Sequence, residues 1–597
     1  MKTEKLYLIT TADEITWKFD QPVIFLGESC RLYERKHIWK NMEAIVAKPY
    51  GLDNSTKEAD FSKILVLKQK LFSEFCEILN QHNNTCHSER FWKIFLGHWF
   101  ERILVLLLNR INTLKQCFKL YKISGTTMLK SNNNLATLDS THINTASVDD
   151  RWNNLLNLQI FNFLKVDFPI KFVQEKDNFR VSPNLGIKPI TTNQSFKIKS
   201  LNWCLYNFNK ISRRFLNDKD AFIMNSYLPL QMEIKLELIL KQFPQIWKVQ
   251  RTKLDLSEIV KIPDKLLRKK LTEKFFYKTD CDFENIVRSL LFKLLPICYL
   301  EGFQGVKKIA DRQPWPKSPK FIFTSNEYDT NEIFKLWTAF KVESGFKYFI
   351  GQHGNNYGTK KNFSQLTETI TPDKFITWGH KNLICHTPAF IFKTVGTKKK
   401  VYNSKGGIIL MQICHPGCYE TQDIESQHIK YFDDQKKFVK MLTNDPKKNL
   451  TIRLHPAFRI FRWSEKKRWF DFDPSLKLDT CEVNINKLIS NNRLVVHSYD
   501  STGMLETLSQ NIPTLAFWQN GLDHIESSAI PHYQALIDSG IIHLSAKSIA
   551  GKVNNIWNDV DGWWNQNHVQ KSRRQFCDIY AKTSQNPLSK LKKILLS

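Results

Sequence analysis

The segment from Asn449 to Trp518 contains NLTIRLHPAFRI at 449–460 and, after a polar interval, LVVHSYDSTGMLETLSQNIPTLAFW at 494–518. Each half begins with an apolar run of strand length and breaks at polar residues. LVVHS has the composition of a buried parallel strand, and Leu505 and Leu508 follow it at helical spacing. IPTLAFW then predicts a second strand, which closes a βαβ unit. The segment therefore predicts an α/β sheet of parallel strands.

Both polar breaks fall at predicted carboxyl ends of strands, where open α/β sheets bind their ligands. Ser501 or Thr502 is predicted to cap the helix, whose free backbone N–H groups would suit an anion. A nucleotide phosphate is the predicted ligand. The residues expected to face it are Arg453, His455, Pro456, His497, Ser498, Ser501 and Thr502. A structural reading stays open, because His-Pro also forms plain turns and serine is an ordinary helix cap.

A second αβ series lies between Pro314 and Gly379. It reads as a strand (FIFTS), a helix from Asn331 to Glu343, and two further strands in KYFIGQHG and DKFITWG. The polar residues at these strand ends are Asn326, Glu327, Asp329, Gln352, His353, Gly354 and Asn355. Gly354 and Gly358 would permit a close approach of the backbone. These strand ends are expected to converge on one cleft.

The 597-residue chain is long enough for two or three domains. Its formal net charge of +29 suggests an anionic partner such as nucleic acid, a membrane surface or a polyanionic glycan. The basic residues are spread along the whole chain, so a compositional bias explains them equally well. The twelve cysteines contain no CxxC pair, which favours neither a zinc site nor a disulfide framework. A reducing cytoplasm is the expected location.

In the N-terminal region LYLITTADEITW, followed by PVIFLGESC at 22–30, reads as two short strands with a loop between, and helical patterns run from Lys57 to Leu120. No signal peptide is expected at the N-terminus. The most hydrophobic segment, Phe95–Ile111, carries Glu101 and Arg102 and is short for a bilayer, so a buried amphipathic helix is predicted. Residues 131–150 are predicted to form a polar loop, residues 167–200 an irregular insertion, and LNWCLYNFNK at 201–210 a strand. GGIILMQICHPG, with His415-Pro416, predicts a strand and a loop facing the cleft.

The expected fold is α/β, with two Rossmann-like domains facing a central cleft and extra N-terminal helices. This is the architecture of GT-B glycosyltransferases. The predicted division is an N-terminal, acceptor-side Rossmann-like domain over 1–395, a nucleotide-binding domain over 396–570, and a basic C-terminal helix over 571–597.

Several motifs resemble those of bacterial transferases encoded in O-antigen and surface-polysaccharide gene clusters. These motifs are FLGESC (25–30), PICYLEGFQGVKK (296–308), FTSNEYDTNEIFKLW (323–337), IGQHGNNYG (350–358), DKFITWG (373–379), RLHP (453–456) and HSYDSTGMLETL (497–508). Ser29 is a departure, since tryptophan is expected there. The resemblance covers most of the chain and implies surface-polysaccharide or lipopolysaccharide biosynthesis.

RLHP and HSYDST are also similar to motifs of CMP-sugar-using transferases, including capsule Kdo transferases and GT-B sialyltransferases. The resemblance implies that His455 contacts the CMP phosphate, that Ser501 and Thr502 donate further hydrogen bonds to it, and that Glu506 accepts from the ribose hydroxyls. The implied donor is CMP-Kdo or another CMP-activated acidic sugar. No cofactor or metal is expected, because Arg453, His455 and a helix N-terminus would supply the positive potential.

The chemistry of such a transfer suggests further roles. A retaining double displacement needs a carboxylate nucleophile, for which Asp329, Glu301 and Glu28 are candidates. His353 is the first candidate for general base or for contact with the donor carboxylate. The residues expected to bind the substrate are Glu28, Asn326, Gln352, Gly354 and Asn355. Each also has a structural reading as a cap, a turn or a surface charge.

Two other functions stay open. A CDP-glycerol-type polymer transferase would share the architecture and the phosphate site. A non-enzymatic nucleic-acid-binding protein would explain the charge, although no nucleic-acid motif is present, and no nucleic-acid partner is expected. The basic C-terminus SKLKKILLS suggests peripheral attachment to the inner membrane, where lipid-linked acceptors sit.

Overall fold

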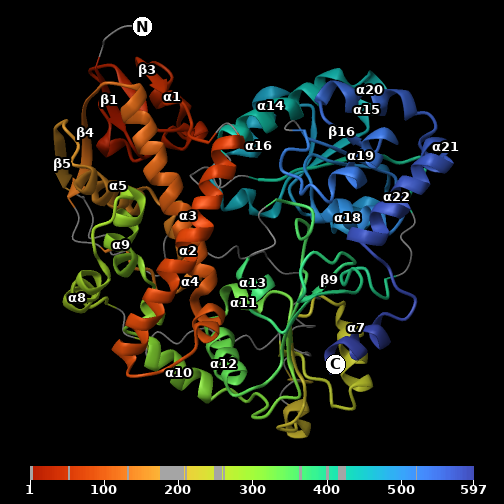
Figure 1. Ribbon diagram of the computed structural model, residues 1–597. Helices are drawn as coiled ribbons and strands as arrows, with labels where there is room; N and C mark the ends of the chain where they lie inside the picture. The colour runs from red at the N-terminus through yellow and green to blue at the C-terminus, as the bar shows by residue number, and fades with distance from the viewer. Residues whose placement is uncertain are drawn as a thin grey trace.

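The computed structural model (Figure 1) describes residues 5–597 except for ten gaps. The gaps are 52–53, 131–133, 175–206, 209–210, 248–258, 260–261, 362–365, 398–401, 415–424 and 519–520. The predicted strand at 201–210, most of the predicted irregular insertion and the His415-Pro416 loop therefore lie mainly or wholly outside the described residues.

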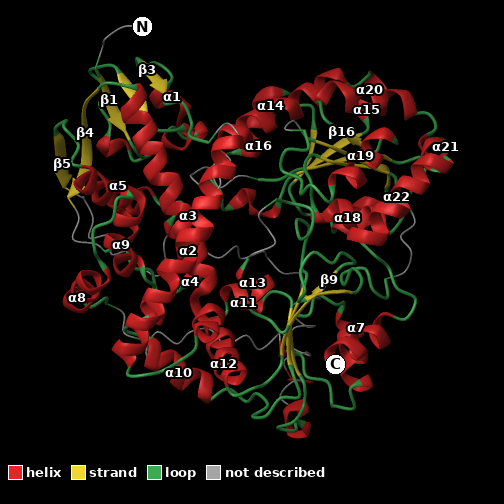
Figure 2. Ribbon diagram, in the orientation of Figure 1, coloured by secondary structure: helices red, strands yellow, loops and turns green. Residues whose placement is uncertain are grey.

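Three parallel sheets form the framework (Figure 2). The first has the order β3-β2-β1-β4-β5 and comprises β1 (Leu6–Ile9), β2 (Val23–Phe25), β3 (Ala44–Val46), β4 (Ile123–Lys130) and β5 (Ile170–Gln174). The middle sheet has the order β10-β9-β8-β7-β6 and comprises β6 (Phe222–Met224), β7 (Ile322–Thr324), β8 (Tyr348–Gly351), β9 (Lys374–Thr377) and β10 (His386–Pro388). The third has the order β13-β12-β11-β14-β15-β16 and comprises β11 (Gly407–Met411), β12 (Leu450–Arg453), β13 (Lys477–Asp479), β14 (Asn492–His497), β15 (Thr514–Phe517) and β16 (Ile542–His543).

The order of the third sheet is the 3-2-1-4-5-6 arrangement of a Rossmann fold. The predicted α/β fold with Rossmann-like parallel sheets is confirmed. Residues 1–395 carry two sheets, where a single Rossmann-like domain was predicted. The domain boundaries at 395 and 570 stay predictions.

Helices cover the sheets and connect them. The helices up to residue 343 are α1 (Lys36–Trp39), α2 (Asn54–Asn83), α3 (Glu89–Leu120), α4 (Ser140–Ala146), α5 (Asp150–Leu164), α7 (Leu230–Ile239), α8 (Lys265–Phe275), α9 (Asp282–Leu294), α10 (Phe303–Asp311), α11 (Glu327–Thr330) and α12 (Glu332–Glu343). The later helices are α13 (Thr367–Ile370), α14 (Glu425–Met441), α15 (Asn444–Lys448), α16 (Glu465–Phe472), α17 (Ile485–Ser490), α18 (Thr502–Ser509), α19 (Ile530–Asp538), α20 (Ala546–Ile556), α21 (Val560–Trp564), α22 (Asn567–Tyr580) and α23 (Pro587–Leu596).

The predicted buried helix at Phe95–Ile111 forms the centre of α3, whose core-facing residues include Trp99 and Leu107. None of the described helices combines the length and the apolar composition that a bilayer span requires. The predicted polar loop at 131–150 contains α4, which Asp139 caps by accepting from the His142 backbone N–H. Local capping thus produced a helix in a segment whose composition indicated a loop.

The apolar cores show how the sheets are joined. One continuous core runs from the first sheet through α3 to the α12 face of the middle sheet, with Tyr7, Trp99 and Phe334 among its members. A second core fills the C-terminal sheet. A third lies under α7 and includes Leu591 and Leu595 of α23, so the end of the chain returns from the C-terminal sheet to the middle one. The apolar face of the basic C-terminal helix is therefore already packed.

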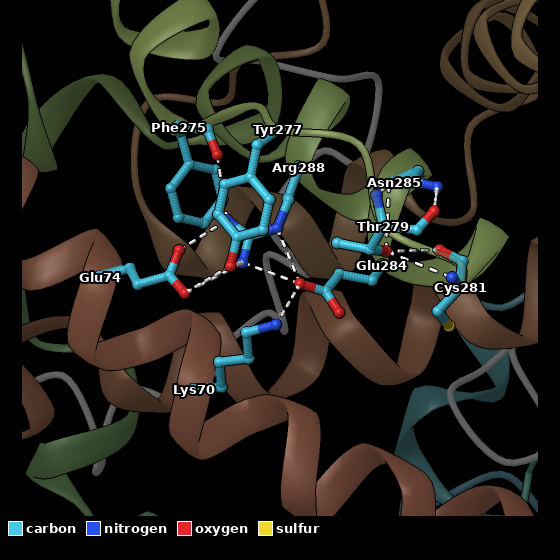
Figure 3. A network of polar contacts seen from close by, with 9 residues as sticks. All are labelled: Lys70, Glu74, Phe275, Tyr277, Thr279, Cys281, Glu284, Asn285 and Arg288. Carbon is cyan, nitrogen blue, oxygen red and sulfur yellow. Dashed lines mark hydrogen bonds and ion pairs between the residues drawn. The ribbon is translucent and has the colours of Figure 1, made fainter.

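A buried charge network holds the helical layer together (Figure 3). The Arg288 guanidinium on α9 is fully buried and donates to Glu74 of α2 at 2.6 and 3.0 Å, to Glu284 at 2.9 Å and to the Tyr277 hydroxyl at 2.7 Å. Lys70 of α2 donates to Glu284 at 3.0 Å. Because its buried cation meets carboxylates from two helices, the network fixes α2 against α9.

Candidate active site at the meeting of two sheets

The carboxyl edge of the middle sheet meets the N-terminus of α18. The Asn355 backbone N–H, four residues past β8, donates to Thr502 Oγ1 at 2.9 Å, and its side-chain amide donates to Asp500 Oδ1 at 2.6 Å. A Cβ at Gly354 would lie 3.0 Å from Thr502 Oγ1, so glycine permits this close approach. Gly354, Asn355 and Thr502, predicted from separate segments, are thus brought together.

Ser501 is the N-cap of α18, and it is one of the two residues that were predicted as alternatives for this cap. Its Oγ accepts from the Met504 backbone N–H at 3.1 Å and lies 3.2 Å from His497 Nδ1. The other His497 ring nitrogen lies 3.2 Å from Thr507 Oγ1, and burial lowers the pKa of His497 to about 3. Ser501 therefore caps α18 and also contacts His497, which is buried and neutral.

Two other predicted phosphate ligands are engaged within the C-terminal sheet. The buried Ser498 hydroxyl donates to the Met411 carbonyl at 2.6 Å and lies 2.6 Å from the Tyr431 hydroxyl. Arg453 forms an ion pair with Asp479 of β13 and donates to the Val483 carbonyl at 2.7 Å. Both residues brace the strand ends around the place where the strand order reverses, between β11 and β14.

His455 lies at the end of β12, beside that reversal point, and Pro456 begins the short helix after it. His455 Nδ1 accepts the Ala457 backbone N–H at 3.2 Å and lies 3.1 Å from Cys414 Sγ. Desolvation lowers the pKa of His455. Because Nδ1 accepts, the neutral ring carries its proton on Nε2, and the exposed imidazole is a hydrogen-bond donor for an anion.

Glu506, expected at the ribose, lies on α18 with its Oε1 3.3 Å from Lys393 Nζ. The same ammonium group lies 5.1 Å from the centre of the Tyr227 ring, and the Tyr227 ring lies 5.9 Å from that of His353. Lys393 therefore links the predicted ribose contact to the predicted catalytic histidine, and sequence reasoning did not single it out.

His353 is half-buried at the end of β8. Its Nδ1 lies 3.1 Å from the Tyr328 hydroxyl and 3.3 Å from the Tyr357 hydroxyl. Tyr357 donates to Glu368 Oε1 at 2.9 Å, so its proton is used there. When Tyr328 donates to Nδ1, the proton of the neutral ring is on Nε2. Burial lowers the pKa of His353 to about 4, so at neutral pH the ring is an uncharged donor.

Glu368 is the last residue in this series of buried hydrogen bonds. Burial raises its pKa to about 7, with the Glu101 charge as the next cause. Its Oε2 lies 3.7 Å from His98 Nδ1, and the His98 ring stacks on Tyr328 at 4.7 Å. The carboxyl group and the stacked ring thus hold the two tyrosines that orient His353.

Asp329, the first nucleophile candidate, lies on α11 with Oδ1 2.7 Å from Arg102 Nη1. Burial alone raises the pKa of Asp329, but the Arg102 charge and hydrogen bond outweigh it, and the pKa is lowered. Asp329 is therefore ionised. Its negative charge acts on His353, where it raises the pKa of the ring against the larger lowering effect of burial. Its carboxylate is partly neutralised by Arg102.

The other two carboxylate candidates lie elsewhere. Glu301 accepts both Nε and Nη2 of Arg268, at 2.7 and 2.6 Å, with both side chains buried. Glu28 follows β2 of the first sheet and accepts from Arg31 at 2.8 and 2.5 Å. The described contacts join neither residue to the His353 cluster. Their proposed roles stay predictions.

Gln352 and Asn326 shape the edge of the middle sheet. The buried Gln352 side chain donates to the Gly354 carbonyl at 2.8 Å and accepts the Trp378 backbone N–H at 2.8 Å. Asn326 stands at the cap position of α11, and its backbone N–H donates to Thr324 Oγ1 at 3.2 Å. Gln352 thus fixes the turn that delivers Gly354 to α18.

Asp500 was missed by the sequence analysis. Its Oδ2 accepts from the Tyr533 hydroxyl at 2.9 Å and lies 3.6 Å from His524 Nε2, while Oδ1 accepts from Asn355. Asp500 lies inside the HSYDST motif, and this position in the motif could have identified it from the sequence. Among the residues that the structure describes, no three His, Cys, Asp or Glu side chains are grouped as metal ligands.

Comparison with known proteins places the chain in a family. The sequence matches the model of the LIC12162 family transferase over residues 6–595. No curated protein matches the chain.

Solved structures give weak similarities. Spinosyn rhamnosyltransferase SpnG, complexed with spinosyn aglycone, has 11% identity, with 55% of this chain and 82% of that one covered at a TM-score of 0.29. For MurG of Acinetobacter baumannii the identity is 9%, the coverages 63% and 99%, and the TM-score 0.29. For the wall teichoic acid polymerase TagF the identity is 11%, the coverages are 48% of this chain and 78% of that one, and the TM-score is 0.28. Scores this low carry no argument about activity.

Proposed function

The chain belongs to the LIC12162 family of transferases, and on that premise we propose that it is a glycosyltransferase that moves an acidic sugar from a CMP-activated donor to a glycan or lipid-linked acceptor. The proposed sugar is Kdo or a related ulosonic acid. The observation that carries the proposal is the junction of Asn355 with Asp500 and Thr502, which sets a predicted phosphate site against a predicted catalytic edge.

The proposed phosphate contacts are the Nε2–H of His455 and the free backbone N–H groups at the start of α18. A CMP-ulosonic acid has a phosphate leaving group that needs such donors more than it needs a strong acid. Arg453 and Ser498 act in this proposal by holding the strand ends, because Arg453 Nη1 and the Ser498 hydroxyl are bonded within the C-terminal domain.

The proposed role of His353 is donation from Nε2–H to the sugar carboxylate or to the charge that develops in the transition state. Its bonded Nδ1 and lowered pKa favour this role over that of general base, the alternative that the sequence left open. Asp329 is the proposed nucleophile if configuration is retained, since it is ionised and Glu301 and Glu28 are paired elsewhere. No cofactor or metal enters this scheme.

The proposed place of action is the cytoplasmic face of the inner membrane, in O-antigen or other surface-polysaccharide assembly. A lipid-linked acceptor would be met there, and the large positive charge suits an anionic leaflet.

Donor screening tests this proposal. The purified chain is incubated with CMP-Kdo, CDP-glycerol, UDP-sugars and GDP-sugars, and the released nucleotide is measured by mass spectrometry. We expect release of CMP from CMP-Kdo above the rate without enzyme. Turnover of CDP-glycerol alone would instead identify a polymer transferase, and turnover of UDP-sugars or GDP-sugars would contradict the CMP donor.

A further inference from the structure

Helix α7 mixes charged and apolar residues on both of its faces, since two glutamates are buried beside the core residue Leu236. Its two carboxylates point inward: Glu233 accepts from Ser226, and Glu237 accepts the Gln245 backbone N–H at 2.7 Å. Both glutamates are buried, whereas Leu238 and Ile239 are 56% and 39% exposed. A helix that faces only water carries its charged residues outside and its apolar ones inside. The exposed leucine and isoleucine therefore call for an occupant other than water.

Further exposed apolar residues lie before and after α7 in the chain. Phe243 follows Ile239 by four residues, and its ring stacks on that of Phe215 with 4.8 Å between centroids. Phe215 is 58% exposed, and the nearby Ile211 is 59% exposed. We call Ile211, Phe215, Leu238, Ile239 and Phe243 the α7 surface. Neighbouring exposed apolar residues of this size mark an interaction site, whereas single ones need no explanation.

Basic residues fringe the α7 surface. Lys235 lies on the exposed side of α7, Lys241 follows the helix, and Arg214 and Lys219 flank Phe215. Among the described residues, none of these four has an ion-pair partner. The nearest exposed carboxylate along the chain, Asp218, is 3.8 Å from Lys317. Apolar side chains surrounded by unpaired cations complement an anionic lipid surface, where apolar groups enter the acyl boundary and cations meet headgroups.

The C-terminal helix lies at the same corner of the molecule. Helix α23 packs beside α7 (Figure 1), and Leu591 of α23 is buried in the core under α7. Lys593 of α23 is exposed. The basic C-terminal helix therefore carries positive charge next to α7, although its own apolar face is occupied.

We propose that the α7 surface, with Lys235, Lys241 and Lys593 beside it, docks the protein on an anionic phospholipid membrane. This inference deepens the proposed function. It rests on that function only for the reason why the protein would dock, which is access to a lipid-linked acceptor. Vesicle binding itself requires no donor, so the two proposals fail separately.

Co-sedimentation with vesicles tests the inference. The full chain is mixed with phosphatidylethanolamine vesicles that contain phosphatidylglycerol, and with phosphatidylcholine vesicles. We expect binding to the anionic vesicles, weakened about tenfold or more by Leu238→Ser with Ile239→Ser, because the lost apolar burial is large. Lys235→Glu with Lys241→Glu should weaken it about tenfold at low salt and less at high salt.

Matched controls lie on other surfaces. Val66→Ser with Ile384→Ser changes two residues that are 78% and 100% exposed, and Lys265→Glu with Lys269→Glu changes two lysines of α8. These variants should bind vesicles like the unchanged protein. Equal losses in the controls, or no binding of the unchanged protein to anionic vesicles, would overturn the proposal. A dimer in sedimentation velocity that Leu238→Ser with Ile239→Ser dissociates, without vesicle binding, would assign the surface to a second copy instead.

Discussion

Replacing His353 by phenylalanine is expected to lower kcat with the proposed CMP-sugar donor by about 10²- to 10³-fold, the usual cost of one preorganised donor at developing charge. Phenylalanine keeps the ring among Tyr227, Tyr328 and Tyr357 but has no Nε2–H. Because the loss falls on the transition state, nucleotide affinity should change little. Steady-state kinetics and a CMP titration on the same preparation check both statements.

The control is His37→Phe, a change at an exposed histidine of α1 far along the chain from the site. It should leave kcat unchanged. An unchanged kcat in His353→Phe would remove His353 from the mechanism. An equal loss of CMP binding would instead assign it a role in the ground state.

Replacing Glu284 by alanine is expected to lower the free energy of unfolding by about 1.5–3 kcal/mol, since the buried Arg288 loses one of its two carboxylate partners and keeps only Glu74. Arg288 is fully buried, and Glu284 is nearly so. Lys70 loses its partner as well. Urea unfolding, followed by fluorescence of the tryptophans in the shared core, measures the change.

Two further variants separate charge from packing. Glu273→Ala removes an exposed partner of Lys269 on α8 and should cost less than about 0.5 kcal/mol. The double change Glu284→Leu with Arg288→Met should recover much of the loss, because an apolar pair of similar volume avoids the desolvation of a buried charge. A double variant as unstable as Glu284→Ala would show that the network stabilises through its hydrogen bonds.

The C-terminal sheet was predictable because its signals are local. A buried apolar run, a polar cap and helical spacing each depend on a few neighbouring residues, so the sequence predicted the strand in LVVHS and a cap at Ser501 or Thr502, of which the structure has Ser501. Local sequence patterns do not determine the order of the strands in a sheet. That residues 1–395 form two sheets depends on which strands pair, and strands of three or four residues in the first sheet give little pattern.

The candidate site was predictable only in part. Asn355 and Thr502 were each placed at strand or helix ends, but their hydrogen bond joins segments 147 residues apart and leaves no trace in either. Arg453 and Ser498 were expected to face a phosphate, and that role stays a prediction. The structure adds their bonds to Asp479 and to the Met411 carbonyl, which residue type at a strand end did not indicate.

Glu368 illustrates what sequence reasoning could not reach. It lies on the short helix α13, outside any periodic pattern, and its importance comes from Tyr357, His98 and burial. A carboxyl group whose pKa is raised to about 7 is a property of its surroundings in three dimensions.

The most direct test of the proposed CMP site is a thermal-shift titration with CMP, UDP and GDP on the unchanged protein and on His455→Ala. We predict a rise in the unfolding temperature with CMP, little with UDP or GDP, and loss of the CMP effect in the variant, because ligand binding stabilises only the state that holds the site. A response to CMP that persists in His455→Ala, or a preference for UDP or GDP, would contradict the account.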